Sequence, residues 1–500
     1  MSVQVEESHQ TAFQQISRAS LLAAGWPALL AVVVSGITLG FFAWFMLLVP
    51  MQSTALSQGG LLLGLVGGPV LTLWAWFAYS NYFARRAGVR LQRSLQYDAL
   101  TWSPFILLWL TFVLPLEYTH GARLLVVCTG LFAIAKLIIA ARFNQTVRDV
   151  LIDFVLTRVA IIVIAELAAI IIGQRAGTHV QESRHLLLNV WGRWDAVHYL
   201  EIATVGYHGT DMAFFPLYPM LLAIVGNLIG NHLIAGLLIS NTAFFFGLLY
   251  LYKLVEHEFD RHVARRAIFY ISIFPTSIFF SAVYTESLFF MLTVASFYYM
   301  RAHRWWIAGF IGLFAAMTRV EGVLLMVPFA IEWYMSYRGR LSEGWRSLLP
   351  VVLIPLGMIA YMGYLWVLNG DPLYFSHVQS HWNRQLAAPW TALINSFHKI
   401  THGNNAQSIA GQWLELGFTA LMIAVLIAGW KRLKPSYIAY MALSILVPMS
   451  TSSLMSMPRF ALVLFPMFAI FALWGNRPAF NNAIVALSLP LLGLFTVLFT

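Results

Sequence analysis

The sequence is poor in charge and nearly free of cysteine. Only 10% of its 500 residues are charged, whereas a soluble domain carries about 25% charged residues. Its single cysteine, Cys128, excludes an intramolecular disulfide and leaves the redox compartment undefined. Polar and apolar residues do not alternate with a period of two, which excludes a transmembrane β-barrel. We find no soluble domain, no low-complexity tract and no convincing internal repeat.

Long apolar runs fill the chain from residue 20 to the C-terminus. Together with the 60% hydrophobic content, they predict an all-α, polytopic transmembrane protein. Residues 1–19 are polar, and the apolar stretch that follows is too long for the core of a signal peptide, so we expect a retained first span. The net charge of +10 is spread over many short loops and therefore indicates topology, with no nucleic acid partner.

Basic residues predict how the chain crosses the bilayer, because cytoplasmic loops collect Lys and Arg. Basic clusters occur within residues 85–93, 142–148, 261–266, 301–304, 338–346 and 431–434, and at Arg477. If all of them face the cytoplasm, the chain makes roughly 13 to 15 crossings, starts inside and ends outside. The predicted spans are 20–49, 60–83, 102–117, 121–141, 151–173, 233–255, 263–281, 284–300, 305–318, 320–336, 348–368, 409–430, 436–450, 459–475 and 480–499.

One apolar stretch does not fit this pattern as a span. If residues 213–230 crossed the bilayer, the basic cluster at 261–266 would lie outside. Pro216 and Pro219 disrupt a regular helix start there, so we predict a juxtamembrane or re-entrant element.

Three regions follow from this topology. We predict extra transmembrane helices in residues 1–145, a catalytic module in residues 146–346 that contains the Asp195 loop, and a C-terminal transmembrane region in residues 347–500. The C-terminal region carries outer loops at 370–408 and 451–459. The predicted topology places both loops on the same side of the bilayer as Asp195 and Glu286, which suggests one extracytoplasmic active site.

The longest polar interruption of the apolar sequence is Trp191-Gly-Arg-Trp-Asp-Ala-Val-His-Tyr199. Aromatic faces stack on sugars, and a carboxylate accepts a proton from a hydroxyl group. A sugar transferase outside the cytoplasm has no nucleotide sugar there, so its donor must be carried on a lipid phosphate. Asp195 is the best candidate for the base, and the guanidinium groups of Arg319 and Arg459 suit the phosphate.

Several ordered segments resemble the PIG-V family of membrane mannosyltransferases, which are related to the second mannosyltransferase of GPI-anchor assembly. These are Trp194-Asp-Ala-Val-His-Tyr-Leu-Glu-Ile-Ala203, Gly206-Tyr207, Ala213-Phe-Phe-Pro-Leu-Tyr-Pro219, the segment 274–287, Thr318-Arg-Val-Glu-Gly322, Gly370-Asp-Pro-Leu-Tyr-Phe375 with Gln379 and Trp382, and Ser456-Met-Pro-Arg-Phe460. The resemblance covers about residues 150–475. It departs from the family at the long N-terminal region and at Phe460, where a tyrosine is common.

The resemblance implies a GT-C fold with juxtamembrane helices in the first extracytoplasmic loop of the module. It also implies a polyprenyl- or dolichyl-phosphate-mannose donor, inverting transfer and Asp195 as the general base. Arg319, Arg459 and Arg384 are the expected ligands of the donor phosphate. The expected sugar and acceptor contacts are Trp191, Arg193, Trp194, His198, Tyr199, Tyr207, Tyr284, Glu286, Gln379, His381 and Trp382.

The expected partners are the isoprenoid phosphate sugar, a glycolipid or glycan acceptor and the lipid bilayer. We expect no required cofactor and no metal, although His377 and His381 have the i, i+4 spacing of metal ligands. Short loops and the lack of an ER retrieval signal favour a bacterial plasma membrane over an ER membrane. If the protein were in an ER membrane, the site would face the lumen.

Alternative interpretations stay open for single residues and for the whole chain. Asp195 could pair with Arg193, Arg319 could pair with Glu321, and Asp211 is the second candidate carboxylate. A lipid or sugar transporter without chemistry is the main alternative, although transporters usually carry polar groups on both sides of the midplane and pseudo-symmetric halves. A non-catalytic assembly subunit is the third.

Overall fold

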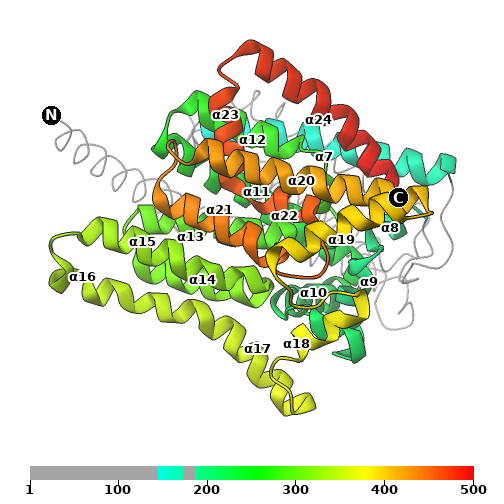
Figure 1. Ribbon diagram of the computed structural model, residues 1–500, viewed down its shortest axis with the longest axis horizontal. Helices are drawn as coiled ribbons and strands as arrows, with labels where there is room; N and C mark the ends of the chain where they lie inside the picture. The colour runs from blue at the N-terminus through cyan, green and yellow to red at the C-terminus, as the bar shows by residue number, and fades with distance from the viewer. Residues whose placement is uncertain (1–144, 173–185) are drawn as a thin grey trace, which may run out of the picture. The chain divides into compact units, whose positions relative to one another are not determined.

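The computed structural model describes residues 145–172 and 186–500, and these residues are almost entirely helical (Figure 1). Leu386 and Thr451 form an isolated antiparallel bridge. By its internal contacts the chain divides into two units, residues 1–148 and 149–500. The spans predicted before residue 145 lie outside the described residues. The three regions predicted from the sequence stay predictions.

The helices of the described residues follow one another without long unstructured connections. The α-helices are α7 (Gln145–Ile172), α8 (Leu186–Asn189), α9 (Asp195–Val205), α10 (Leu217–Ile229), α11 (His232–Glu258), α12 (Arg261–Ser272), α13 (Glu286–Arg301), α14 (Trp305–Thr318), α15 (Met326–Tyr337), α16 (Leu341–Leu348), α17 (Leu353–Asn369), α18 (Tyr374–His377), α19 (Pro389–His402), α20 (Ala406–Gly429), α21 (Pro435–Met449), α22 (Met457–Val463), α23 (Phe465–Trp474) and α24 (Pro478–Phe499). Short 3-10 helices are η3 (Val190–Gly192), η4 (Gly209–Ala213), η5 (Ser277–Phe280), η6 (Val320–Leu325), η7 (Leu349–Val352) and η8 (Val378–Trp382).

Five helical segments in the described residues are long and apolar enough to cross a membrane. They are Thr146–Ile171, His232–Glu258, Leu341–Asn369, Ala406–Gly429 and Pro478–Phe499, and the bent pair formed by α22 and α23 would make a sixth. Most of their residues are not buried by protein, since only 22–28% of four of the apolar windows is buried and 56% of the fifth. Apolar helices exposed to this degree need lipid around them, and the predicted all-α polytopic class is confirmed.

Two predicted spans are broken by proline. The helix expected over residues 263–281 ends at Ser272, and the chain continues through Pro275 into the turn η5. The span expected over 459–475 bends by 72° between α22 and α23, where Leu464 precedes Phe465-Pro466. Proline disfavours a helical residue before it and lacks the N–H that a continuous helix requires. Both breaks place irregular backbone beside the site described below.

The element predicted to stop short of spanning is α10. It has 13 residues, which corresponds to about 20 Å against the ~30 Å of a bilayer core. Pro216 and Pro219 occupy its N-cap and first turn, where their missing N–H groups cost little. Gly230 ends the helix in the left-handed conformation.

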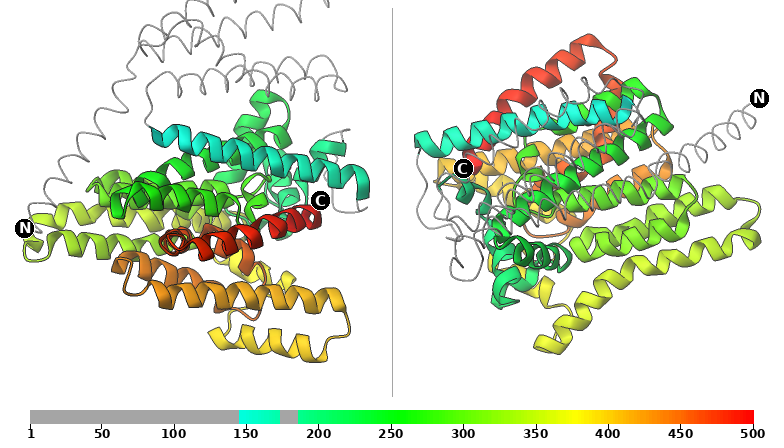
Figure 2. Two further views of the ribbon diagram at one scale, coloured as in Figure 1. Left: turned by 90° about the horizontal axis from the view of Figure 1, so that it is seen from above. Right: turned by 180° about the vertical axis from the view of Figure 1, so that it is seen from behind.

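The buried helix α13 lies between α11 and α14, and α17 packs on the other side of α14 (Figure 1). The packing of α11 on α13 is close, because a Cβ at Gly247 would lie 2.6 Å from the Phe290 ring. In Figure 2, the view from above shows α7 and the hairpin of α19 and α20 on opposite sides of this group. Thirteen of the sixteen residues of α13 are buried, so this helix is the fixed element from which the site is built.

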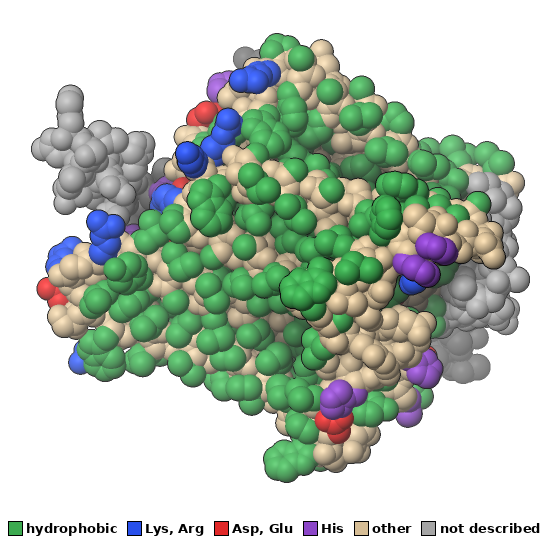
Figure 3. Space-filling model, viewed as in Figure 1, with side chains coloured by type: hydrophobic (Ala, Val, Ile, Leu, Met, Phe, Trp, Pro, Cys, Tyr) green, Lys and Arg blue, Asp and Glu red, His purple; other side chains and the backbone are tan. Residues whose placement is uncertain are grey.

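The basic side chains of the drawn face are unevenly distributed. Figure 3 shows a broad apolar face with most of its Lys and Arg gathered toward one end and several histidines toward the other. Exposed basic residues mark the turns after α15 and α20, namely Arg338, Arg340, Lys431 and Arg432, and exposed Arg346 lies in the following helix α16. Residues 370–405 connect the end of α17 to the start of α20, and these helix ends lie away from the basic turns. The polar segments of the site are therefore separated from the basic turns by the length of these helices.

Candidate active site

Five charged side chains form one continuous series of ion pairs, here called the ion-pair chain: Asp195, Arg459, Glu286, Arg319 and Glu321. Nη1 of Arg459 lies 2.5 Å from Oδ2 of Asp195, and its Nε lies 2.6 Å from Oε1 of Glu286. The same Glu286 oxygen accepts from Nη1 of Arg319 at 3.1 Å, and Nε of Arg319 lies 3.4 Å from Glu321. Segments up to 264 residues apart in sequence thus meet at one place.

Local helix ends position the members of the ion-pair chain. Asp195 and Glu286 are the first residues of α9 and α13, where the helix dipole favours a negative charge. Arg319 is the C-cap of α14, where the dipole favours a cation. Arg459 lies in the first turn of α22, directly after Pro458. Three of these four placements are therefore favourable for the isolated helix as well as for the site.

The residue before Asp195 has an unusual backbone. Trp194 has φ 57° and ψ −125°, a conformation that L residues with a Cβ rarely adopt. Such a conformation costs on the order of 1–3 kcal/mol and persists where the surrounding structure imposes it. The indole of Trp194 remains 52% exposed, beside the carboxylate that begins α9.

Aromatic rings cover the guanidinium groups. Arg459 lies over the rings of Tyr284 and Phe279, with 4.7 and 5.3 Å from its Cζ to the ring centroids. Arg319 lies over Phe289 at 5.7 Å and Phe460 at 5.2 Å. Arg384 shares the Phe460 ring, at 5.6 Å. Phe460, at which the sequence departs from the family pattern, therefore contacts two of the three predicted phosphate ligands through its ring.

Three predicted contact residues hold the Asp195 loop in place. The hydroxyl of Tyr284 donates to the carbonyl of Arg193 at 3.2 Å. Trp191 is buried and donates its indole N–H to Glu166 at 3.2 Å, while its carbonyl accepts from the N–H of Val283. Arg193 is buried as well. These residues fix the loop against the chain segment that leads into α13.

A second group of predicted residues surrounds His198. Its Nδ1 lies 2.7 Å from Oδ1 of the buried Asp211, and its ring stacks on Phe214 at 4.7 Å. Burial lowers the pKa of His198, but the hydrogen bond and the charge of Asp211 outweigh it and raise the pKa above the ordinary 6.5. Trp382 meets the His198 ring edge-on at 6.0 Å. Asp211, the second candidate carboxylate, is thus occupied by a histidine.

Tyr199 and Tyr207 have different surroundings. The hydroxyl of buried Tyr199 lies 3.3 Å from that of Thr285, the residue before Glu286. Tyr207 donates to the carbonyl of Phe214 at 3.0 Å, and its ring lies against Tyr361. Tyr199 therefore lies beside the ion-pair chain, whereas Tyr207 joins the loop after α9 to α17.

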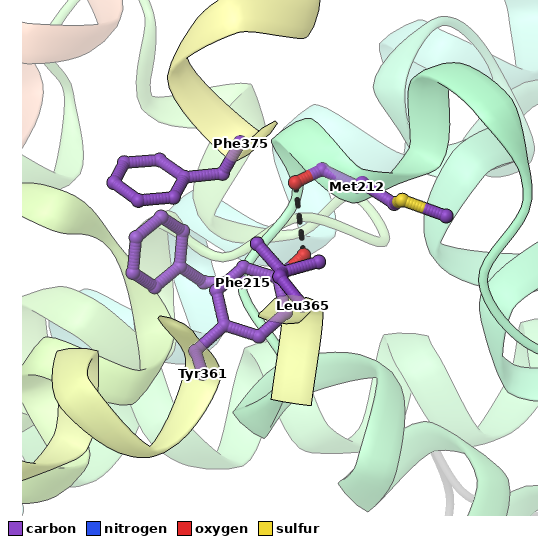
Figure 4. Close-up of a cluster of buried hydrophobic side chains, with 5 residues drawn as sticks. All are labelled: Met212, Phe215, Tyr361, Leu365 and Phe375. Carbon is purple, nitrogen blue, oxygen red and sulfur yellow. Dashed lines mark hydrogen bonds between the residues drawn. The ribbon is translucent and has the colours of Figure 1, made fainter. Parts of the chain in front are cut away.

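A buried apolar cluster anchors that loop to α17. Figure 4 shows Met212 and Phe215 against Tyr361, Leu365 and Phe375. The Tyr361 hydroxyl lies 2.9 Å from the carbonyl of Met212 and 3.0 Å from that of Phe214. The cluster holds the loop after α9 in a fixed position relative to α17 and α18.

The outer segment after α17 supplies the remaining predicted residues. Nε of Arg384 lies 3.4 Å from the Thr451 hydroxyl, and its backbone N–H donates to the carbonyl of Gln379. His381 is exposed, with its ring 6.4 Å from that of Trp382. In the described residues, no hydrogen bond joins the side chains of Gln379 or His381 to the ion-pair chain. Arg384 contacts the Phe460 ring and Trp382 the His198 ring, whereas His381 is exposed to solvent.

The site combines a reachable carboxylate with a buried one. The side chain of Asp195 is 35% exposed, whereas that of Glu286 is fully buried. Oε2 of Glu286 has no hydrogen-bond partner in the described residues. Arg319 and Arg459 each bind two carboxylates, and no carboxylate lies within salt-bridge distance of Arg384 among the described residues. The site thus holds an exposed carboxylate at Asp195 and, at Arg384, a guanidinium group that no carboxylate of the described residues binds directly.

The histidines considered as metal ligands have another partner. Nδ1 of His377 lies 2.7 Å from Oδ2 of Asp371, and the hydrogen bond lowers the pKa of Asp371. Residues 145–172 and 186–500 contain no group of three or more His, Cys, Asp or Glu side chains that could hold a metal ion.

Three further residues of the site were not predicted from the sequence. Glu166 in α7 bonds to Trp191, and Arg158 in the same helix lies within hydrogen-bond distance of the carbonyls of Ser272 and Ser277. Glu415 in α20 accepts from the backbone beside Arg459. Each is a charged residue inside an apolar run, and that position alone marks it for attention.

The fold and the site together define a class: a polytopic helical membrane protein with an aromatic-lined, charged centre at the ends of its helices. The comparison with known families agrees with this class. Residues 143–338 match the family model of the PIG-V mannosyltransferases, described as Mannosyltransferase (PIG-V). The predicted resemblance is confirmed over these residues, which carry Asp195, Glu286 and Arg319.

The curated relatives that the chain matches are also named as mannosyltransferases. The chain is 23% identical over 227 residues to GPI mannosyltransferase 2 of Schizosaccharomyces pombe, covering 40% of this chain and 49% of the relative. It is 27% identical over 211 residues to GPI alpha-1,6-mannosyltransferase 2 of Mus musculus, covering 36% and 41%. It is 28% identical over 244 residues to GPI mannosyltransferase 2 of Cryptococcus neoformans, covering 40% and 56%.

These matches cover only part of each protein. The chain spans about half the length of the curated relatives it matches. No solved structure matches the chain. The family model ends at residue 338, so the predicted correspondence of the segments that contain Arg384 and Arg459 stays a prediction.

Proposed function

We propose that this chain is an inverting glycosyltransferase that moves mannose, or a related hexose, from a polyprenyl-phosphate sugar to an acceptor outside the cytoplasm. The ion-pair chain carries this proposal, because it brings Asp195 together with Arg459 and Arg319 at an aromatic-lined place, and Arg384 lies over the same Phe460 ring as Arg319. The similarity to mannosyltransferases supports a glycosyl transfer reaction and favours mannose as the sugar.

The reaction is a single displacement. The acceptor hydroxyl attacks the anomeric carbon, so a new oxygen–carbon bond forms while the bond between that carbon and the phosphate oxygen breaks. The hydroxyl proton passes to the carboxylate of Asp195, and the electron pair of the broken bond leaves on the polyprenyl phosphate. A positioned base contributes about 10²–10⁴-fold to such a rate, and the exposure of Asp195 allows the hydroxyl to reach it.

Arg384 is the first contact of the donor phosphate in this proposal. A phosphate must compete with two carboxylates for Arg319 and for Arg459, but it meets no such competition at Arg384. Arg384 and Arg319 both lie against the Phe460 ring, with 5.6 and 5.2 Å from their Cζ atoms to its centroid. A phosphate bound at this ring edge would contact both guanidinium groups.

Donor binding then acts on the base through Arg459. In the structure, Nη1 of Arg459 occupies Oδ2 of Asp195. A phosphate that draws this guanidinium away leaves the carboxylate available for the acceptor proton. The donor therefore prepares the base, and the acceptor attacks only a site that already holds its phosphate.

The distribution of basic residues supports an extracytoplasmic site. The basic turns after α15 and α20 occupy the end of the helices that the positive-inside rule assigns to the cytoplasm. The segments 370–405 and 450–456 lie toward the other end of the same helices. A lipid-linked donor is the form of activated sugar available on that side, and it reaches the site within the bilayer.

The proposal is tested with the purified full chain in lipid nanodiscs. Labelled polyprenyl-phosphate mannose is supplied with a panel of glycolipid and glycan acceptors, and GDP-mannose serves as the comparison donor. We expect product from the lipid donor alone, with an anomeric configuration opposite to that of the donor. Transfer from GDP-mannose alone would refute the donor class, and retained configuration would refute the single displacement. Movement of labelled lipid without a glycosidic product would instead establish a flippase.

A further inference from the structure

We propose that Glu415 of α20 is a positioning residue that holds Arg459 in place for the reaction. The proposal rests on the proposed function, because the role of Arg459 in transfer is part of it. Glu415 lies outside the residues that match the family model, and it belongs to no segment that carries the resemblance.

Both carboxylate oxygens of Glu415 bind the backbone that leads into Arg459. Oε1 accepts from the N–H of Ser456 at 3.0 Å, and Oε2 accepts from the N–H of Met457 at 2.7 Å. These residues are three and two positions before Arg459 at the start of α22. Pro458, which lies between Met457 and Arg459, has no N–H to donate. Glu415 therefore binds the two backbone donors that are nearest to Arg459 on its N-terminal side.

The backbone held by Glu415 is not one that the chain adopts easily. Ser456 has φ 75° and lies in the left-handed region, although it carries a Cβ. Such a residue stays in place only where its surroundings over-determine it. A charged acceptor bound by two N–H groups provides this, because charge-assisted hydrogen bonds are stronger than neutral ones.

A second contact fixes the same turn from the opposite direction. The hydroxyl of Thr276 donates to the carbonyl of Pro458 at 3.1 Å. Thr276 lies in the broken region between α12 and α13, close in sequence to Phe279 and Tyr284, whose rings cover Arg459. The turn is thus held between α20 and the segment that leads to Glu286.

The position of Glu415 argues against an acid that only faces solvent. It lies within Ala406–Gly429, one of the helices apolar enough to cross a membrane, and an acid there is expensive without a partner. Both of its hydrogen bonds go to backbone N–H groups, and its charge also acts on the guanidinium groups of Arg459 and Arg384 from a longer distance. Glu415 therefore acts on the direction from which Arg459 reaches Asp195 and Glu286.

The first measurement reads the contact itself and does not depend on catalysis. Hydrogen–deuterium exchange of the peptide that contains Ser456 and Met457 is compared in the wild type, Glu415→Ala, Glu415→Gln and Glu343→Gln. The control acid, Glu343, is 66% exposed and lies on α16. We expect exchange about tenfold faster in Glu415→Ala, as for the loss of a buried hydrogen bond. Glu415→Gln keeps one carbonyl acceptor and should fall between, and Glu343→Gln should match the wild type.

The second measurement is a double-mutant cycle for transfer from polyprenyl-phosphate mannose. A small displacement of a positioned group costs on the order of 10²-fold in rate, and we expect this loss in kcat for Glu415→Ala. Glu415→Gln should recover part of it. The double variant Glu415→Ala/Arg459→Ala should be no slower than Arg459→Ala alone, because Glu415 acts through Arg459.

The outcomes separate this proposal from the proposed function. Unchanged exchange in Glu415→Ala, or losses that multiply in the double variant, would overturn the positioning role. If the wild type itself transfers no sugar, the proposed function fails, and the exchange measurement still decides whether Glu415 holds the turn. If Glu415→Ala does not fold, Glu415→Gln carries both measurements, with an expected loss smaller than that of Arg459→Ala.

Discussion

The two ends of α13 carry two ion-pair networks of opposite character. At its first residue, Glu286 belongs to the ion-pair chain of the candidate site. At its last residue, Arg301 lies 2.6 Å from Glu258 and 2.9 Å from Glu332. Both charges suit the dipole of the helix, negative at its start and positive at its end. The helix dipole therefore does not distinguish the two networks, and their difference lies in the groups that surround Glu286 and Arg301.

The network at Arg301 is closed. Lys434 lies 3.1 Å from Glu258, and the hydroxyl of Ser436 donates to Glu332 at 2.5 Å. The side chains of Glu332 and Glu258 are 1% and 8% exposed. The network at Glu286 differs, because Asp195 is reachable and one oxygen of Glu286 has no hydrogen-bond partner in the described residues. The saturated network joins α11, α13, α15 and α21 to one another, and the function proposed above assigns substrate binding to the unsaturated one.

The largest effect we expect on stability comes from the closed network. Arg301→Ala leaves two buried carboxylates without their main partner, and breaking a buried pair costs about 3–5 kcal/mol. Denaturation in detergent should show this loss, while transfer per folded molecule stays within about twofold of the wild type. The matched control is Arg340→Ala at an exposed pair, which should change stability little. If Arg301→Ala lost transfer activity without losing stability, the network at Arg301 would have a functional role and not the structural role assigned to it here.

Arg459→Lys tests the open network. Lysine keeps the charge but lacks the planar fork by which Arg459 reaches Asp195 and Glu286. We expect kcat to fall on the order of 10²-fold, with an unfolding midpoint near that of the wild type. Arg432→Lys at the exposed basic turn is the control. Normal transfer by Arg459→Lys would show that a point charge is sufficient there.

A smaller effect is expected at the cluster between the loop after α9 and α17. Tyr361→Phe removes the hydroxyl that binds the carbonyls of Met212 and Phe214, at a cost of about 1 kcal/mol. Hydrogen exchange in residues 208–215 should become faster, while exchange around Arg459 should not change. Equal loosening of both regions would mean that the cluster and the ion-pair chain form one unit.

The smallest effect is a pH dependence at His198. Asp211 raises the pKa of the folded-state histidine above 6.5. The stability that the charged pair contributes is therefore fully present below pH 6.5 and is lost as the pH rises through the raised pKa. Unfolding midpoints of the wild type and His198→Gln should differ most at low pH and converge at high pH. A difference that grew with pH would contradict the sign of this shift.

The sequence identified the charges of the site but not how they pair. Asp195, Glu286, Arg319 and Arg459 stand out because each interrupts an apolar sequence. The sequence left Asp195 with Arg193 as a possible partner, and the structure pairs it with Arg459 instead. Arg319 binds Glu321, as one alternative had it, and also Glu286. Such pairings depend on how distant helices pack, which local sequence does not determine.

The fold was also predicted in part, with some helix limits found and some helix breaks missed. The limits of α14 agree with the predicted span, because a continuous apolar run defines them. The breaks after Ser272 and at Leu464 were missed, although Pro275 and Pro466 mark them. Glu415 was missed because its partners are backbone N–H groups 41 and 42 residues away, which no side-chain pattern reveals.

The most direct test compares one carboxylate from each of the two ion-pair networks that meet the ends of α13. Transfer from polyprenyl-phosphate mannose and thermal unfolding are measured in parallel for Asp195→Asn and Glu332→Gln. The account predicts that Asp195→Asn loses about 10²–10⁴-fold in kcat and keeps its stability, while Glu332→Gln loses stability and keeps its transfer rate per folded molecule. Full transfer by a folded Asp195→Asn protein would contradict the assignment of Asp195 as the base.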